Sequence, residues 1–302
     1  MKQAQKEKIG TDSTGTVTLV APALVFLVAF AFVPFVILFA FSFFRMDLAN
    51  AAGFREFVGL EHYRALLQGD PSFTSAVRRT IEFTAIGVVF EIIVGTLLAI
   101  FLHGLGSKMK SFVISIAILP MLMAPVAVGL MWLFLLQPDY GLMTHVVISL
   151  TGFKGALLAD PKVALLVVRL IDVWEWTPFV TLVMLAGLSS VPRSVLEAAQ
   201  VDGLKFGQRL LNIYWPALRG ILLVALLIRI IEAVKVFDIV YILTGGGPGN
   251  TTEMASVYLQ RLAIRETRFG YASAATIIVN YVVLLLTAAF FRIASQRKEH
   301  RD

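Results

Sequence analysis

The sequence contains no cysteine and only four histidines. Without cysteine the chain has no disulfide, no thiolate metal site and no cysteine nucleophile, so redox chemistry says nothing about its compartment. The histidines are scattered at His62, His103, His145 and His300 and form no metal-ligand spacing. There is no Gly-x-Ser-x-Gly elbow either. We therefore expect neither a metal site nor a catalytic site, and no cofactor bound by this chain.

Charge is also scarce, at 15% of residues, whereas hydrophobic residues make up 58% and the mean hydropathy is +0.82. These values lie outside the range of soluble domains. The net charge of +6 does not come with any nucleic-acid-binding module. Because the apolar residues are gathered into runs long enough to cross a bilayer as helices, the sequence predicts a polytopic membrane protein.

The apolar runs predict an all-α fold with about six transmembrane helices. They lie at about 17–44, 77–102, 111–136, 163–188, 218–243 and 272–292. An even number of spans places both termini on one side. The segments on the side of the N-terminus hold most of the dense basic residues, so the positive-inside rule favours a cytoplasmic N-terminus and a cytoplasmic C-terminus.

The N-terminus could be taken for a secretory signal peptide. Lysines at positions 2, 6 and 8 precede an apolar run, and Ala49-Asn50-Ala51 has the small-x-small pattern of a cleavage site. The run from Val17 to Phe44, however, is about twice as long as a signal core, so we expect an uncleaved first transmembrane helix.

One cytoplasmic segment, residues 189–217, is too long for a tight helix connection. Pro192 can stand in the first turn of a helix, and Gly203 can supply the left-handed residue that ends it. A second short helix is predicted from Lys205 to Tyr214, with Pro216 at the start of the next span. The segment therefore predicts a helix-turn-helix outside the bilayer.

This segment carries a specific pattern: Glu197-Ala198-Ala199, three residues, Gly203, nine residues, then Ile213-Tyr214-Trp215-Pro216. It resembles the EAA loop of bacterial ABC importer permeases, and its one departure is Trp215 where the family pattern has leucine. The resemblance implies a role in coupling to an ATPase for Glu197, Ala198, Ala199, Asp202, Gly203, Ile213 and Pro216. An ordinary amphipathic loop is the alternative.

Further segments resemble the carbohydrate-uptake subgroup of these permeases. They are Val58 to Tyr63, Phe237-Asp238, Thr244 to Thr252 and Phe269 to Ala274. The resemblance implies a type I ABC importer transmembrane domain in the bacterial inner membrane. The implied partners are a second, homologous permease, two ATPases that bind ATP and Mg, and an external solute-binding protein. The implied solutes are sugars, oligosaccharides, polyols and glycerol phosphate derivatives.

The glycine run from Gly245 to Gly249 could be mistaken for a phosphate-binding loop. It lacks the lysine that precedes the Ser/Thr of a P-loop, and the predicted topology places it outside the membrane. A turn-forming external loop that faces the solute-binding protein is the better interpretation.

Ionisable residues inside the predicted spans are costly and usually face a bundle interior or a cavity. Arg229, Glu232, Lys235 and Asp238 follow one another at three-residue spacing in the fifth span, so alternating-sign pairs can form along one helix face. Arg169, Asp172 and Glu175 repeat this pattern in the fourth span. Internal charge pairing and a polar path for a hydroxylated solute are both open. Glu82 and Glu91 stand more isolated and suggest helix packing.

Carbohydrates are bound by flat apolar faces together with hydrogen-bonding groups. The candidate residues of the substrate pathway are Asp172, Trp174, Glu175, Trp176, Arg229, Glu232, Lys235, Asp238, Asn280 and Tyr281. A tryptophan at the end of a span can instead be an interfacial anchor.

The predicted organisation has three parts. Residues 1–76 form the N-terminal segment, first helix and first external loop, residues 77–292 the five-helix core with the coupling loop 189–217, and residues 293–302 a cytoplasmic tail. The predicted function is a permease subunit that forms half of the pathway of an ATP-driven importer for a carbohydrate-type solute. An ion-coupled secondary transporter is the main alternative, and a membrane-embedded enzyme is a weaker one.

Overall fold

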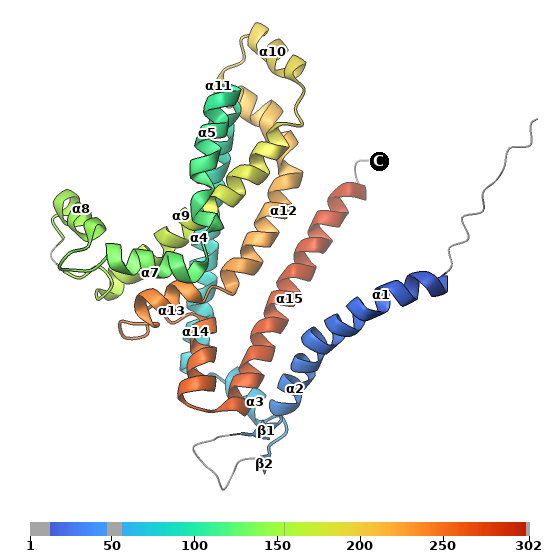
Figure 1. The fold of residues 1–302 in the computed structure, drawn as a ribbon, viewed down its shortest axis with the longest axis vertical. Helices are drawn as coiled ribbons and strands as arrows, with labels where there is room; N and C mark the ends of the chain where they lie inside the picture. Colours follow the sequence, from blue (N-terminus) through green and yellow to red (C-terminus); the bar gives the residue numbers. More distant parts are fainter. Residues whose placement is uncertain (1–12, 47–55, 154, 300–302) are drawn as a thin grey trace, which may run out of the picture. The chain divides into compact units, whose positions relative to one another are not determined.

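The computed structural model describes residues 13–46, 56–153 and 155–299 of the chain. Its contacts divide the chain into two compact units. Unit 1 comprises residues 1–65 and 262–277, and unit 2 comprises residues 66–261 and 278–302. The described residues are mainly helical, as predicted (Figure 1).

Unit 1 begins with an apolar helical rod. Helix α1, Ser13–Leu27, continues through a π-helical turn, Val28–Phe32, into α2, Val33–Phe41. The π turn precedes Pro34, which has no N–H to donate to the ladder of helical hydrogen bonds. The rod corresponds to the first predicted span.

A short hairpin and the start of α3 complete the described N-terminal part of unit 1. Strands β1, Phe44–Arg45, and β2, Glu56–Phe57, pair antiparallel, and α3, Glu61–Leu67, follows. Arg45 donates to Glu56 and to Glu61, each at 2.9 Å, and so fastens the hairpin to α3. The chain returns to this unit with the π-helical turn Arg261–Arg265 and the first residues of α15, Phe269–Glu299.

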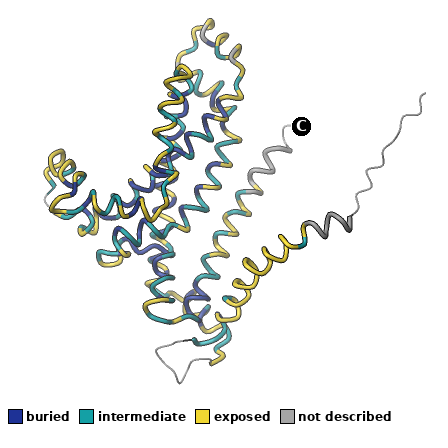
Figure 2. Tube along the Cα trace, viewed as in Figure 1, coloured by how far each residue is buried: buried dark blue, intermediate teal, exposed yellow. Residues whose placement is uncertain are grey.

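Three helices form the centre of unit 2: α4, Pro71–His103, α9, Pro161–Leu188, and α12, Trp215–Val234. Both α4 and α9 begin with proline directly after an aspartate N-cap, Asp70 or Asp160, whose side chain accepts two backbone N–H bonds. Buried residues run along these three helices in Figure 2. One hydrophobic core of unit 2 lies between them, with Ala99, Val180 and Leu218, and another joins α4 and α9 to further segments, with Phe83, Val168 and Ile239.

The third predicted span, 111–136, is not one helix. It is divided into α5, Ser107–Ala117, α6, Leu119–Leu122, and α7, Pro125–Leu135, because Pro120 and Pro125 cannot continue a helical hydrogen-bond ladder. The following segment contains a helix that the sequence patterns did not predict, α8, Leu142–Thr151, which ends at left-handed Gly152.

The fifth predicted span, 218–243, is also broken. Helix α12 ends at Val234, and α13, Asp238–Thr244, begins after Lys235 to Phe237, where the backbone leaves the helical region. Helix α14, Ala255–Gln260, follows the glycine-rich turn. The sequence does not reveal this break, because the backbone turns at Lys235, Val236 and Phe237, none of which is a glycine or a proline.

By length and composition, three helices among the described residues can cross a membrane: Val20–Phe41, Pro71–His103 and Phe269–Phe290. Helix α9 has 28 residues but carries three charged side chains near its middle, at Arg169, Asp172 and Glu175. The all-α membrane fold is confirmed, whereas the number of six spans and the division at residue 76 stay predictions.

Helices α4 and α9 pack closely at Gly95. A Cβ at this position would lie 2.7 Å from Cβ and Cγ1 of Val180 and 3.2 Å from the backbone oxygen of Thr177. Gly87, two turns earlier on α4, faces Asp172 and Arg169 of α9. Small residues on α4 thus let the two backbones approach each other.

We expect Gly95→Ala to lower the free energy of unfolding by about 1–3 kcal/mol, because the added methyl group overpacks this contact. Thermal unfolding of the purified protein in detergent measures the change. Gly220→Ala on α12 is the matched control, since a Cβ there meets no atom within 4 Å. Equal stability of the Gly95→Ala variant and the wild type would contradict the close packing.

Candidate functional sites: a coupling loop and a buried charge cluster

The segment between α9 and α12 is a helix-turn-helix, as predicted. Helix α10, Arg193–Val201, is followed by Gly203 at φ +71°, and Leu204 N–H donates to Ala199 O at 3.0 Å, as in a Schellman cap. Helix α11, Phe206–Arg209, then begins, with Gln208 Oε1 accepting from Lys205 N–H at 2.8 Å. Local capping signals therefore determine both ends of the turn.

The loop offers a hollow surface. Ala198 and Glu197 are exposed on α10, whereas Ala199 is buried. A depression of about 390 Å³ lies beside α10. Its lining residues are Ser194, Val195, Ala198, Ala199, Asp202, Leu204 and Ile213. The small alanine side chains leave room for a partner's side chain, and Glu197 and Asp202 place negative charge on this surface. This arrangement suits docking, and nothing in it suggests chemistry.

The loop passes into α12 without interruption. The π-helical turn Leu210–Tyr214 leads directly into Trp215, the first residue of α12. Tyr214 is 9% exposed and packs in a core cluster with Leu188 and Leu218, whereas Trp215, the one departure from the EAA pattern, is 54% exposed. Pro216 occupies the first turn of α12, as predicted.

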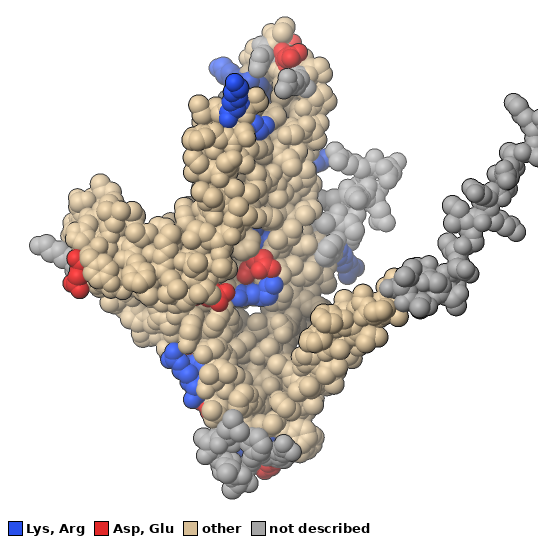
Figure 3. All heavy atoms as spheres, viewed as in Figure 1, with Lys and Arg blue, Asp and Glu red and all other residues tan. Residues whose placement is uncertain are grey.

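Basic side chains gather at this end of unit 2. Blue spheres lie over α5 and the α10–α11 segment in Figure 3, in agreement with exposed Lys108 and Lys205. A red patch on the same end marks acidic side chains. The end of unit 2 that carries the coupling loop thus presents charged side chains of both signs.

A cluster of ionisable side chains lies buried among α4, α9 and α12. Arg229 is 1% exposed, Glu91 is 0% exposed and Asp172 is 2% exposed. Arg229 Nε donates to Glu91 Oε2 at 2.5 Å and Nη2 donates to Glu91 Oε1 at 2.7 Å, while Nη2 also contacts Asp172 Oδ2 at 3.0 Å. One guanidinium fork therefore joins three helices.

Two further α9 side chains adjoin this cluster. The guanidinium of Arg229 lies over the ring of Trp176, with its Cζ 4.4 Å from the ring centroid. Glu175 is 3% exposed, and its Oε2 atom is buried without a hydrogen-bond partner. The cluster thus contains three carboxyl groups and one guanidinium, with an aromatic ring on one side.

The pairing predicted from residue spacing is partly wrong. Glu232 and Lys235 form the expected ion pair at 3.0 Å, and both are well exposed. Arg229 does not pair with Glu232 but with Glu91 and Asp172, because the guanidinium reaches across to α4 and α9 and not along its own helix. Asp238 is the first residue of α13 and not part of the fifth helix.

The remaining pathway candidates lie outside the cluster's hydrogen bonds. Trp174 is 38% exposed and makes an edge contact with Trp132, with ring centroids 5.4 Å apart. Asn280 and Tyr281 occupy exposed positions of α15 and do not bond Arg229. The sequence patterns missed Glu91 as the main partner of Arg229. Its one signal was a carboxylate in the middle of an otherwise apolar span.

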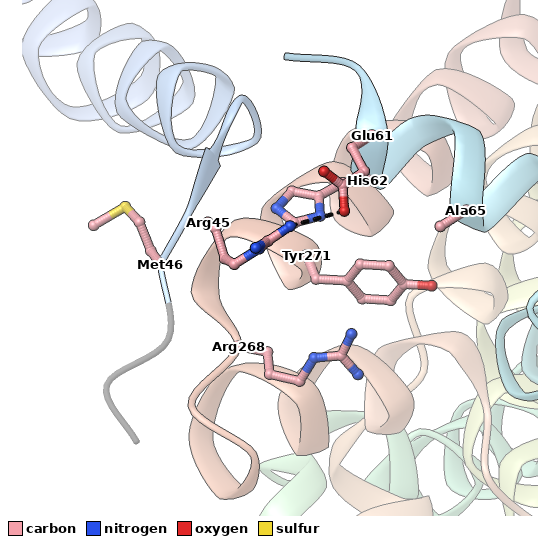
Figure 4. A pocket seen from close by; sticks show the side chains of 7 residues that line it. All are labelled: Arg45, Met46, Glu61, His62, Ala65, Arg268 and Tyr271. Carbon is pink, nitrogen blue, oxygen red and sulfur yellow. Dashed lines mark hydrogen bonds and ion pairs between the residues drawn. The ribbon is translucent and has the colours of Figure 1, made fainter. Parts of the chain in front are cut away.

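Unit 1 contains a second cavity, of about 300 Å³, shown in Figure 4. Its lining residues are Arg45, Met46, Glu61, His62, Ala65, Arg268 and Tyr271. Arg268 lies over the ring of Tyr271, 4.4 Å from its centroid. Gly270 lets the chain pass close to β1, since a Cβ there would lie 1.9 Å from Phe44 O.

His62 connects α3 to β1 in this cavity. Its Nε2 lies 3.2 Å from Phe44 O, and because a carbonyl oxygen only accepts, the ring nitrogen donates. Burial lowers the pKa of His62 below its usual 6.5, because removal from water disfavours the imidazolium.

A family model described as "Binding-protein-dependent transport system inner membrane component" matches residues 91–300. The chain belongs to this family and is a permease subunit of an ABC transporter. It is 32% identical over 283 residues to the sulfoquinovosyl glycerol transport system permease protein SmoG of Agrobacterium fabrum, covering 93% of this chain and 91% of that protein.

Two other proteins extend the comparison. The trehalose/maltose transport system permease protein MalF of Thermococcus litoralis is 32% identical over 248 residues, covering 81% of this chain and 82% of that protein. The crystal structure of a bacterial ABC transporter involved in the import of the acidic polysaccharide alginate contains a chain with the same fold. Its TM-score is 0.81 at 22% identity, over 94% of this chain and 96% of that one.

Removing Arg229 alone leaves two carboxylates buried without their partner. We expect Arg229→Met to lower the free energy of unfolding by about 3–5 kcal/mol. The neutral triple variant Arg229→Met, Glu91→Gln, Asp172→Asn removes the guanidinium together with the two carboxyl groups that it bonds, and recovers most of that loss. Thermal unfolding in detergent compares the two. A single variant as stable as the triple variant would show that the carboxylates do not depend on Arg229.

The pKa of His62 makes the hairpin sensitive to pH. The unfolded state binds a proton more readily than the folded state, so this contribution to stability is fully present above the ordinary pKa of 6.5 and decreases as the pH falls through the lower folded pKa. We expect the hydrogen-exchange protection of the Val58 and Gly59 amides, which donate to Phe43 O, to decrease on acidification in the wild type. His62→Gln removes this dependence, and an equal decrease in that variant would exclude His62 as its cause.

Proposed function

We propose that the chain forms half of the translocation pathway of an ATP-driven importer for a carbohydrate-type solute. The observation that carries this proposal is the coupling loop: the EAA pattern forms a capped helix-turn-helix with a small-residue depression, and this loop continues directly into a core helix. The names of SmoG and MalF, which refer to sulfoquinovosyl glycerol and to trehalose/maltose, support a glycoside or sugar as the solute.

The proposed partners follow from this role. Two ATPase subunits, which bind ATP and Mg, dock on the coupling loop at the cytoplasmic face. A second, homologous permease completes the pathway, and a solute-binding protein delivers the solute from outside. A solved complex of the alginate transporter with an oligosaccharide-bound periplasmic protein supports such an assembly. This chain itself carries no catalytic site and no cofactor, and both of its termini lie in the cytoplasm.

Residues of the proposed coupling site act as a docking surface. Glu197 and Asp202 offer carboxylates to donors of the ATPase groove, while Ala198 and Ala199 allow close approach and Gly203 sets the angle of the turn. Ile213 lines the depression, and Pro216 lies in the first turn of α12. Closure of the ATPases moves this loop, and the differential stabilisation of outward-facing and inward-facing states drives transport.

The proposed solute path uses side chains that are mainly accessible, and Glu175, at 3% exposed, is the buried exception. Trp174, Glu232, Lys235 and Asp238 lie partly exposed at α9 and at the break between α12 and α13. Trp176 and Glu175 adjoin them from α9, and Asn280 and Tyr281 present polar atoms from α15. Asp172 and Arg229 are bonded to each other and to Glu91, so we assign them to holding the helices and not to contact with the solute.

ATP-driven uptake into proteoliposomes that contain the complete importer tests the function. We expect Glu197→Lys and Gly203→Asp each to lower uptake at least roughly ten-fold, because the first reverses a docking charge and the second adds about 1–3 kcal/mol of strain at a positive φ. Gly152→Asp is the matched control: Gly152 also has a positive φ and an open surrounding, but ends α8.

Uptake at the wild-type level in both coupling-loop variants would refute the coupling assignment. Solute uptake by the purified chain alone, driven by an ion gradient without ATPase subunits, would instead identify a secondary transporter.

A further inference from the structure

Helix α12 forms a direct connection from the coupling loop into the core. From Trp215 to Arg229 the chain advances 14 residues without a break in the helix, which corresponds to about 21 Å. At its loop end α12 packs closely on α9, since a Cβ on Gly187 would lie 2.9 Å from Ile221 Cδ1 and 3.0 Å from Leu218 Cδ2. A displacement of the loop therefore moves α12 along its whole length.

At its other end α12 is held by Arg229. The guanidinium binds both oxygens of Glu91 on α4, contacts Asp172 on α9 and lies over Trp176 of α9. This bidentate, stacked geometry fixes distance and angle at once, which a point charge or an apolar contact does not do. Five residues further on, the helix ends at Val234.

The break beyond Val234 has a defined geometry. Lys235 lies at φ −91° and ψ 4°, and Phe237 at φ −136° and ψ −61°, before α13 begins. Ser256 Oγ donates to Val236 O, so a side chain from the first turn of α14 replaces one missing helical hydrogen bond. Residues 235–237 thus separate α12 from α13, and α13 packs separately on α7 through Ile242 and Gly129.

We propose that Arg229 is a positioning residue for coupling. Together with Glu91 and Asp172 it clamps α12 to α4 and α9, so that movement of the coupling loop is passed to these three helices as one body, and residues 235–237 form the hinge at its end. This inference rests on the proposed function. It assigns the buried cluster a role in transmitting movement, which differs from contact with the solute.

The energetics of buried ion pairs agree with this role. Replacing a buried charge cluster by neutral residues of similar volume is often neutral for stability or even stabilises a protein. Stability alone therefore gives no reason for placing a guanidinium and two carboxyl groups between α4, α9 and α12. A clamp of fixed geometry supplies one, because transmission requires that the helices keep one relative arrangement under load.

The test measures moles of solute taken up per mole of ATP hydrolysed by the complete importer in proteoliposomes. The neutral triple variant Arg229→Met, Glu91→Gln, Asp172→Asn keeps the ATPase activity and lowers this ratio roughly ten-fold, within the usual range of coupling between sites. Arg229→Lys keeps the charge but loses the fork, and gives a ratio between those of the triple variant and the wild type. A folding defect lowers the amount of assembled complex, but does not change the ratio per complex.

The control is the double variant Arg78→Met, Glu82→Gln. It removes the other ion pair that begins on α4, at 2.7 Å, whose side chains are 78% and 46% exposed. We expect this variant to take up as much solute per ATP hydrolysed as the wild type.

An unchanged ratio in the assembled triple variant would overturn the clamp while leaving the importer function intact. If the triple variant does not assemble, the ratio in Arg229→Lys decides: a wild-type value overturns the clamp, and a lower one supports it. Absence of ATP-driven uptake by the wild type would instead refute the proposed function.

Discussion

The packing of α4, α9 and α12 in unit 2 is organised around one buried guanidinium. Arg229 brings a full positive charge between α4, α9 and α12, and the cost of removing it from water is offset only while Glu91 and Asp172 remain in bonding distance. The helices must therefore approach each other closely. On α4, Gly87 faces Asp172 of the cluster, and Gly95, two turns further along the same helix, allows the close contact with Val180. The small glycine positions of α4 and the ion pairs of Arg229 thus both require and allow a close approach of the helices.

This constraint gives the transporter a continuous mechanical element. The coupling loop is capped at Gly203 and passes through Tyr214 into α12, whose far end is tied to α4 and α9 before the chain breaks at Lys235. The accessible polar side chains of the proposed solute path lie near that break. In this proposal, α12 itself couples docking of the ATPases to opening of the solute path.

The sequence predicted features whose causes are local. Three of the apolar runs coincide with described helices that can cross a membrane, and Gly203 with its neighbours identified the helix-turn-helix, because capping and turn formation depend on a few adjacent residues. The breaks at Pro125 and Lys235 were missed: a hydropathy run does not register a proline that divides it or a backbone turn among helix-forming residues. α8 was missed for the opposite reason, since it lies in a segment rich in turn residues.

The partner of Arg229 was missed because its cause is not local. Three-residue spacing favoured Glu232, on the same helix, but the guanidinium instead binds Glu91, which lies 138 residues away in the chain. Spacing along one helix identifies possible neighbours on its surface, while a buried charge selects whichever carboxylate the tertiary packing brings to it. Glu91 was noticed as an isolated intramembrane carboxylate and interpreted as a packing residue, which agrees with its bonds to Arg229.

In the proposed importer, the ATPase acts on this chain at the coupling loop. Because the sequence contains no cysteine, a single cysteine at Ala198 can be cross-linked to a single cysteine in the groove of the ATPase partner. We expect this disulfide to form in the assembled importer and to stop ATP-driven uptake, and we expect its reduction to restore uptake. A cysteine at Ala198 that forms no cross-link with the ATPase, while one at a distant position such as Leu142 does, would contradict it.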